Sequence, residues 1–109
     1  MPRGLRDIEP ILSEAKRILQ RVYGDRLRGV ILYGSYARGE ASEDSDIDLI
    51  VLLKDMGDPL DELEKVFGEI HRLDLKYDTL ISIIPFDAGE YDRRSLPIIL
   101  NAKREGVLI

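Results

Sequence analysis

The chain has 109 residues, of which 44% are hydrophobic and 34% are charged. This length suits one domain, and the balance of apolar and charged residues excludes a disordered or fibrous protein. The formal net charge of −5 argues against an extended contact with nucleic acid, which needs a basic face. We therefore expect one globular domain over residues 1–109 that does not bind long nucleic acid.

The sequence contains no cysteine, which excludes disulfides, a thiolate nucleophile and cysteine-bound zinc. The one histidine, His71, cannot form a transition-metal site alone, and we expect it to face solvent on a helix. No apolar run approaches the ~20 residues that cross a membrane, and the charged N-terminal segment lacks the apolar core of a secretion signal. We expect a cytoplasmic protein without a membrane partner.

The first half of the chain predicts two helical segments and two strands. Apolar residues at helical spacing predict an amphipathic helix over 5–23. A short β-rich run over 30–33 predicts the first strand, and residues 34–40 predict a single helical turn. The segment 46–53 begins as alternation and ends as an apolar run, which is typical of a central strand buried on both faces.

The second half predicts two further helices and a third strand. Apolar residues from 60 to 73 mark an amphipathic helix, and residues 77–84 predict a strand that Pro85 closes. Pro97 suits the first turn of a last helix, which Gly106 can end. The order of elements predicts an α/β (α+β) fold with a small mixed sheet and helices mainly on one side. An open sheet edge would leave room for a homodimer or hetero-oligomer.

Asp46 and Asp48 lie two residues apart on the predicted strand 46–53, so their side chains leave the same face. Two like charges this close need a cation. Paired carboxylates suit Mg²⁺ or Mn²⁺, which keep coordination positions open for phosphate oxygens and water. The alternative is a pair of aspartates at a solvated strand end.

Gly34 and Ser35 end one predicted strand and open a helical turn. This arrangement aims backbone N–H groups and a hydroxyl at one point, and any side chain at Gly34 would keep a phosphate from the backbone. A Gly-Ser pair is also a common turn. Together with Asp46 and Asp48 on a second strand, it favours a site for a metal-bound phosphate.

The segment Gly34-Ser35-Tyr36-Ala37-Arg38-Gly39, followed by Ser45-Asp46-Ile47-Asp48-Leu49, resembles the motif of the DNA polymerase β-like nucleotidyltransferase superfamily. The short length is similar to its minimal nucleotidyltransferase (MNT) branch. The resemblance implies a single nucleotidyltransferase domain over residues 1–109. In that fold the Gly-Ser pair contacts a nucleoside triphosphate, and the two aspartates hold divalent metal.

The resemblance also implies a function. Members of the MNT branch are often paired with a HEPN-domain protein in a toxin–antitoxin system, and some transfer AMP to a hydroxyl of that partner. We therefore expect a Mg²⁺- or Mn²⁺-dependent enzyme that uses ATP or another nucleoside triphosphate and transfers a nucleoside monophosphate to a hydroxyl on a protein partner. The alternative is a non-catalytic antitoxin or regulatory module that keeps the nucleotide pocket but acts by covering its partner.

The superfamily's site is completed by a third carboxylate on a strand beside the first two, and we assign Asp78 to this role. Asp78 opens the predicted strand 77–84, where it would hold metal and take a proton from an attacking hydroxyl. Asp74 and Asp87 are the other candidates, because spacing alone does not fix this residue.

Arg38 lies three residues after Ser35, so both would share a face of a helical turn. There the Arg38 guanidinium would bind a triphosphate oxygen, and the alternative is a surface ion pair with Glu40 or Asp44. Tyr36 departs from the relatives, which frequently carry a basic residue at this position. We expect Tyr36 either to stack on the ligand or to pack into the domain.

Overall fold

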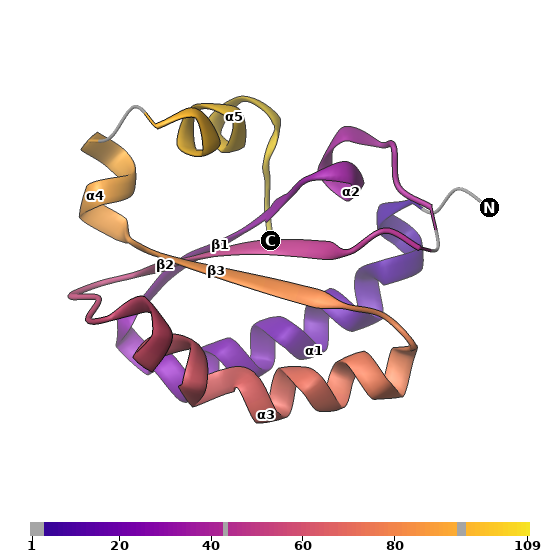
Figure 1. Cartoon of the computed structure of the whole chain (residues 1–109), viewed down its shortest axis with the longest axis horizontal. Coiled ribbons are helices and arrows are strands. Elements are labelled where there is room, and N and C mark those ends of the chain that lie inside the picture. Colours follow the sequence, from indigo (N-terminus) through magenta and orange to yellow (C-terminus); the bar gives the residue numbers. More distant parts are fainter. Residues whose placement is uncertain (1–3, 43, 94–95) are drawn as a thin grey trace.

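The computed structural model describes residues 4–42, 44–93 and 96–109, and it contains a four-stranded mixed sheet with strand order β3-β2-β1-β4 (Figure 1). β2 pairs antiparallel with β1 and parallel with β3, and β4 pairs antiparallel with β1. The predicted fold class is confirmed, with β2 in the interior of the sheet. The elements in chain order are α1 (Leu5–Tyr23), the short 3₁₀ helix η1 (Gly24–Arg26), β1 (Leu27–Tyr33), α2 (Ser35–Arg38), β2 (Ile47–Leu53), α3 (Pro59–Tyr77), β3 (Ile81–Asp87), α4 (Ala88–Arg93), α5 (Pro97–Glu105) and β4 (Val107–Leu108).

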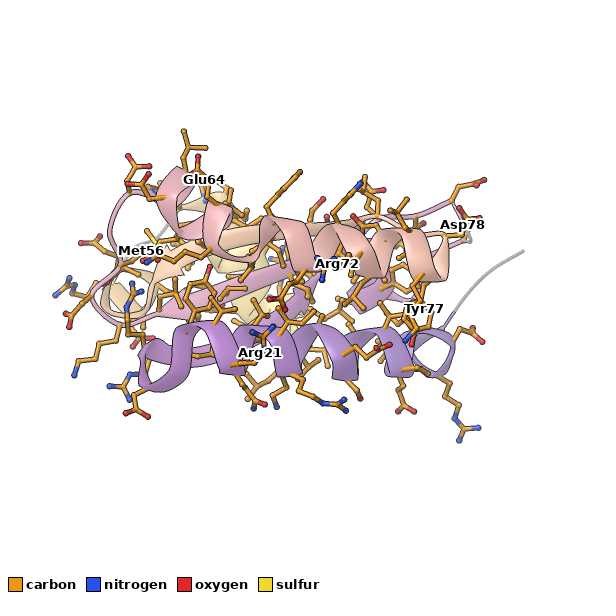
Figure 2. The ribbon with its side chains drawn as sticks, turned by 90° about the horizontal axis from the view of Figure 1, so that it is seen from below. Arg21, Met56, Glu64, Arg72, Tyr77 and Asp78 are labelled. Atoms are coloured by element: carbon orange, nitrogen blue, oxygen red, sulfur yellow. The ribbon has the colours of Figure 1, made fainter. Side chains whose placement is uncertain are left out.

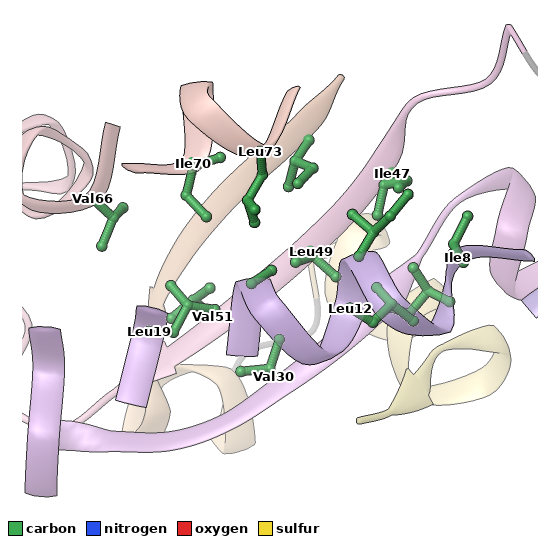
Figure 3. Close-up of a cluster of buried hydrophobic side chains, with 14 of the residues drawn as sticks. Ile8, Leu12, Leu19, Val30, Ile47, Leu49, Val51, Val66, Ile70 and Leu73 are labelled. Carbon is green, nitrogen blue, oxygen red and sulfur yellow. The ribbon is translucent and has the colours of Figure 1, made fainter. Parts of the chain in front are cut away.

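The two long helices, α1 and α3, lie side by side on one face of the sheet (Figures 1 and 2). The side chain of Asp58 caps α3 by accepting a hydrogen bond of 2.8 Å from the backbone N–H of Leu60. The apolar stripes of both helices pack onto the sheet, where burial of these side chains supplies most of the stability of the domain (Figure 3). The main core includes Ile8, Leu12, Leu19, Leu49, Val51, Val66, Ile70 and Leu73.

The opposite face of the sheet carries a smaller core. Ile31 and Ile50 pack there against α4 and α5, through Tyr91, Ile99 and Ala102. Leu49, Ile50 and Val51 are all fully buried, so β2 is covered on both faces as its apolar run predicts. The helix α4 follows β3 directly, in a segment where the sequence pattern predicts no element.

The fourth strand, β4, was also not predicted. It has two residues, and Val107 pairs with Leu32 of β1. A Cβ atom on Gly106 would collide with the Ala102 carbonyl oxygen and with Ile31, so glycine allows α5 to end in close contact with the sheet. A strand this short has no alternation that a sequence pattern can detect.

The predicted strand 77–84 is displaced, because α3 continues to Tyr77 and β3 covers Ile81–Asp87. Asp78 ends the helix in a left-handed conformation with φ of 50°, and its N–H bonds to the Asp74 carbonyl. Pro85 lies inside β3 instead of closing it. An edge strand tolerates proline, since one side of its backbone is not paired.

Beyond the end of β2, the carboxylate of Glu62 is buried with 2% of its side chain exposed. It pairs with the guanidinium of Arg26 and with the ammonium of Lys65 at 2.9 Å, and it accepts the backbone N–H of Gly57 at 3.2 Å. Together these contacts lower the pKa of Glu62 to about 2, with the Arg26 hydrogen bond as the largest cause. In the described ranges, no helix is both long and apolar enough to span a membrane.

Candidate active site

The Gly-Ser turn lies at the end of β1, where Gly34 adopts φ of 80° and ψ of −153°. A residue with a Cβ atom reaches this conformation only with strain. The Gly34 carbonyl accepts a hydrogen bond of 3.2 Å from the backbone N–H of Arg38, which closes the turn. Ser35 is half-buried, and its hydroxyl forms no hydrogen bond within the described part of the chain.

The antiparallel pairing of β1 with β2 sets Tyr33 opposite Asp48, so the turn at Gly34 lies directly beside the Asp48 carboxylate. A Cβ atom on Gly34 would collide with the carboxylate oxygen Oδ2 of Asp48. Asp46 precedes β2 and is exposed, whereas Asp48 is half-buried on β2. The structure thus brings the Gly-Ser turn and the two aspartates together, and what they bind stays a prediction.

Burial raises the pKa of Asp48, the neighbouring Asp46 carboxylate raises it further, and the Arg38 guanidinium partly offsets both. Neither Asp46 nor Asp48 forms an ion pair or hydrogen bond with the residues that the structure describes. Free carboxylate oxygens beside a Cβ-free turn fit a hard cation such as Mg²⁺ or Mn²⁺. Across the described ranges no three acidic or histidine side chains lie close enough together to hold one ion.

Asp78 lies at the C-terminal end of α3, so its predicted place on a strand is wrong (Figure 2). The left-handed cap turns the chain there before β3 begins. Asp78 instead lines an open pocket of about 250 Å³ with Asp46, Asp44 and Thr79. Its role as the third carboxylate stays a prediction. The end of helix α3, and not a strand, places Asp78 at the pocket that Asp46 lines.

The other two candidates for the third carboxylate have structural partners. Asp74 accepts a hydrogen bond of 2.9 Å from the backbone N–H of Ile81, and burial raises its pKa. Asp87 lies at the far end of β3 and accepts backbone N–H groups of Met56 and Glu90, each at 3.2 Å. The β3 residue in register with Asp48 is Ser82, so this strand presents a hydroxyl and not a carboxylate at that level.

Arg38 forms ion pairs on the surface of α2. Its Nε lies 3.4 Å from Glu40 Oε2, and its Nη1 lies 3.9 Å from Glu105 Oε2. The pair with Glu40 is one of the two surface ion pairs expected as the alternative to a phosphate contact. Exposed pairs of this kind contribute little, so a phosphate would compete for the guanidinium. Glu105 was missed, because only the pairing of β4 with β1 brings the end of α5 to α2.

Tyr36 packs into the domain, with 2% of its surface exposed. Its hydroxyl donates a hydrogen bond of 3.4 Å to the carbonyl of Ser42. Of the two alternatives for Tyr36, packing is therefore correct and stacking on a ligand is wrong. The buried ring anchors α2 and the start of the following loop, and both border the candidate site.

Comparison with known proteins identifies similar sequences. Residues 12–103 match the model of the nucleotidyltransferase domain family. A relative from Methanocaldococcus jannaschii, which bears the provisional name protein adenylyltransferase MJ0141, is 44% identical over 78 residues. The match covers 72% of this chain and 78% of the relative.

Similar solved structures share the fold at low sequence identity. A crystal structure of a toxin–antitoxin with AMP-PNP matches with a TM-score of 0.63 and 21% identity, over 88% of this chain and 69% of that one. A structure of the tri-AMPylated Shewanella oneidensis HEPN toxin in complex with its MNT antitoxin matches with a TM-score of 0.54 and 22% identity, over 90% and 69%.

Proposed function

Because the chain belongs to the nucleotidyltransferase domain family, we propose that it transfers AMP from ATP to a hydroxyl group of a protein partner. The resemblance to the nucleotidyltransferase superfamily is confirmed by the family match, and the toxin–antitoxin structures that share the fold support the MNT branch. The provisional adenylyltransferase name of the relative, and the AMP-PNP and AMPylated toxin of those structures, support AMP as the transferred group and a HEPN-domain protein as the partner. The acting unit in this proposal is one domain over residues 1–109.

The contact between Gly34 and Asp48 carries the proposal. It combines a turn without a Cβ atom, a half-buried carboxylate of raised pKa and a second carboxylate, Asp46, that has no partner among the described residues. The two neighbouring carboxylates repel each other, and a bound cation would relieve this repulsion. A turn or a solvated strand end with a purely structural role does not require two neighbouring carboxylates.

Each of these side chains has a separate task in the proposed reaction. The Ser35 hydroxyl and the backbone at the start of α2 position the triphosphate, and Arg38 exchanges Glu40 for a phosphate oxygen. Mg²⁺ or Mn²⁺ held by Asp46 and Asp48 would supply charge neutralisation at the phosphates. Asp78 accepts the proton of the acceptor hydroxyl.

The test is transfer of label from α-³²P-labelled ATP to a HEPN-domain protein encoded beside this chain, in the presence of Mg²⁺. We expect label on the partner with the wild-type chain and none with Asp46→Asn or Asp48→Asn. Exposed Asp25 serves as the control, since Asp25→Asn makes the same chemical change away from the site. Equal labelling by all four proteins would exclude the metal role of Asp46 and Asp48.

A second candidate function is a non-catalytic binding module. It is favoured by the lack of a three-acid cluster among the described residues. The two candidates differ at Asp78. A catalytic role predicts that Asp78→Asn reduces labelling without weakening ATP binding, whereas a binding module predicts no labelling by any variant, together with a rise in melting temperature on adding Mg²⁺ and ATP.

A further inference from the structure

An apolar groove runs between α3 and the edge strand β3. It has a volume of about 420 Å³, and its side chains include an unusually exposed phenylalanine, Phe67, with 69% of its surface open. The ring of Phe67 stacks on His71, which is exposed as predicted, with 5.9 Å between ring centres. Further apolar lining comes from Leu63, Ile70, Leu80 and Ile83.

The groove leads directly into the candidate active site. Leu80, which is 52% exposed, lines both the groove and the acidic pocket that contains Asp46 and Asp78. The two cavities therefore meet at the turn between α3 and β3. Figure 1 shows this turn at the same end of the molecule as α2 and the loop that precedes β2.

The sheet order assigns opposite sides to the two substrates. The Gly-Ser turn follows β1, whereas Asp78 precedes β3, and β2 with Asp48 lies between these strands. In phosphoryl-type transfer the attacking and leaving oxygens are roughly in line. A triphosphate held at Gly34 and Ser35 releases pyrophosphate on the β1 side, so the acceptor hydroxyl must approach from the β3 side, where the groove opens.

The charges that line the pocket and the groove indicate which acceptor segments would bind. Three aspartates, Asp44, Asp46 and Asp78, line the pocket, and Asp74 lines the groove. No lysine or arginine lines either cavity within the described ranges. A segment with a basic residue beside its hydroxyl would be attracted to this end, while an acidic segment would be repelled.

The edge of β3 is a poor template for another strand, and this disfavours a second copy of the chain paired through that edge. The backbone N–H of Ile81 is already bonded to the Asp74 carboxylate, and Pro85 has no N–H to donate. The side-chain groove, and not the backbone edge, is therefore the surface that a partner would use.

We propose that this groove docks the acceptor: a segment of the partner protein places apolar side chains against Phe67 and Leu80 and carries a hydroxyl residue, flanked by a basic residue, into the acidic pocket. This inference rests on the proposed function. The acceptor oxygen bonds to the α-phosphorus, the bond from that phosphorus to the bridging oxygen breaks, pyrophosphate leaves, and the hydroxyl proton passes to Asp78.

The test measures AMP transfer to the HEPN-domain partner as a function of acceptor concentration, with Phe67→Ser and Leu80→Ser. We expect each variant to raise the KM for the acceptor at least about fivefold, the effect of losing an interface anchor, with the KM for ATP unchanged. Leu75→Ser is the matched control, because Leu75 is 72% exposed on α3 but does not line the groove. Thermal unfolding checks that the exposed substitutions leave the fold intact.

A second arm tests the charge, with Asp44→Lys expected to raise the KM for the acceptor and Asp25→Lys, away from the site, expected to leave it unchanged. The affinity for the partner is also measured directly in the presence of a non-hydrolysable ATP analogue. Weakened binding by the groove variants without any transfer in the wild type would overturn the proposed function and keep the groove. Groove variants that match the wild type in KM and affinity, or that alter only self-association, would overturn the groove.

Discussion

Gly34 and Asp48 are in such close contact that a Cβ atom on the glycine would collide with the carboxylate oxygen Oδ2 of the aspartate. The contact follows from the antiparallel register, in which Tyr33, the last residue of β1, lies opposite Asp48. The positive φ of Gly34 turns the chain away from the sheet at this point. Gly34 therefore has two roles: it allows the turn, and it leaves room for the Asp48 carboxylate. Glycine-to-alanine variants can distinguish these two roles.

Gly34→Ala is expected to lower the free energy of unfolding by roughly 1–3 kcal/mol through backbone strain, and also to abolish nucleotidyl transfer by displacing Asp48. Gly24→Ala is the control. Gly24 also has positive φ, at 55°, but no atom lies within 4 Å of the position that the added methyl group would take. Urea unfolding and the labelling assay measure both effects. Loss of transfer in both variants alike would mean that strain alone explains the result.

Asp48→Asn is expected to raise the melting temperature in the absence of Mg²⁺ and to abolish transfer. The raised pKa of Asp48 means that the fold favours the protonated carboxyl. The ionised form therefore weakens the folded state at neutral pH, and this weakening disappears as the pH falls below the ordinary value of 3.8. Thermal unfolding at pH 7 with and without Mg²⁺ and ATP is the measurement.

Asp87→Asn makes the same chemical change as Asp48→Asn, but the expected shift in melting temperature is opposite. Hydrogen bonds from the Met56 and Glu90 backbone N–H groups lower the pKa of Asp87, and they use both of its oxygens. An asparagine keeps only one acceptor oxygen, so this variant should melt at a lower temperature than the wild type. If Asp48→Asn also lowered the melting temperature, the assignment of unfavourable charge to Asp48 would be wrong.

Glu62→Gln is expected to reduce the acid sensitivity of the fold. The pKa of Glu62 falls from 4.5 to about 2 on folding, which corresponds to roughly 3 kcal/mol of stability at neutral pH. This stability is present above the unfolded value of 4.5 and is lost as the pH falls toward 2. Urea midpoints between pH 7 and pH 2.5 should converge for the wild type and the variant. Glu64→Gln, exposed on the same helix, is the control and should track the wild type throughout.

Arg38→Ala is expected to raise the KM for ATP about tenfold, the effect of losing one charged hydrogen bond, with a smaller change in the KM for the acceptor. Arg28→Ala, at an exposed position of β1, removes the same charge away from the turn. Initial rates at varied ATP concentration distinguish the two variants. A similar rise in both would assign the effect to net charge and not to a contact with phosphate.

The sequence alone determined the long amphipathic helices, the central strand and the composition of the Gly-Ser turn and the acidic pair. These features depend on periodicity, on glycine and on residue chemistry over short stretches. It misplaced the start of β3, because helix α3 continues to Tyr77 and Asp78 ends it in a left-handed conformation, which belongs to neither helix nor strand. It also missed β4 and α4, which are too short for a periodic signal.

Only the tertiary structure decided which residues meet. The order of strands brings Asp78 to the pocket of Asp46, and the pairing of β4 with β1 brings Glu105 to Arg38. The choice between stacking and packing for Tyr36 was settled by the core that surrounds its ring. Contacts between distant segments depend on how whole helices and strands bury their apolar faces together, and no local pattern contains that information.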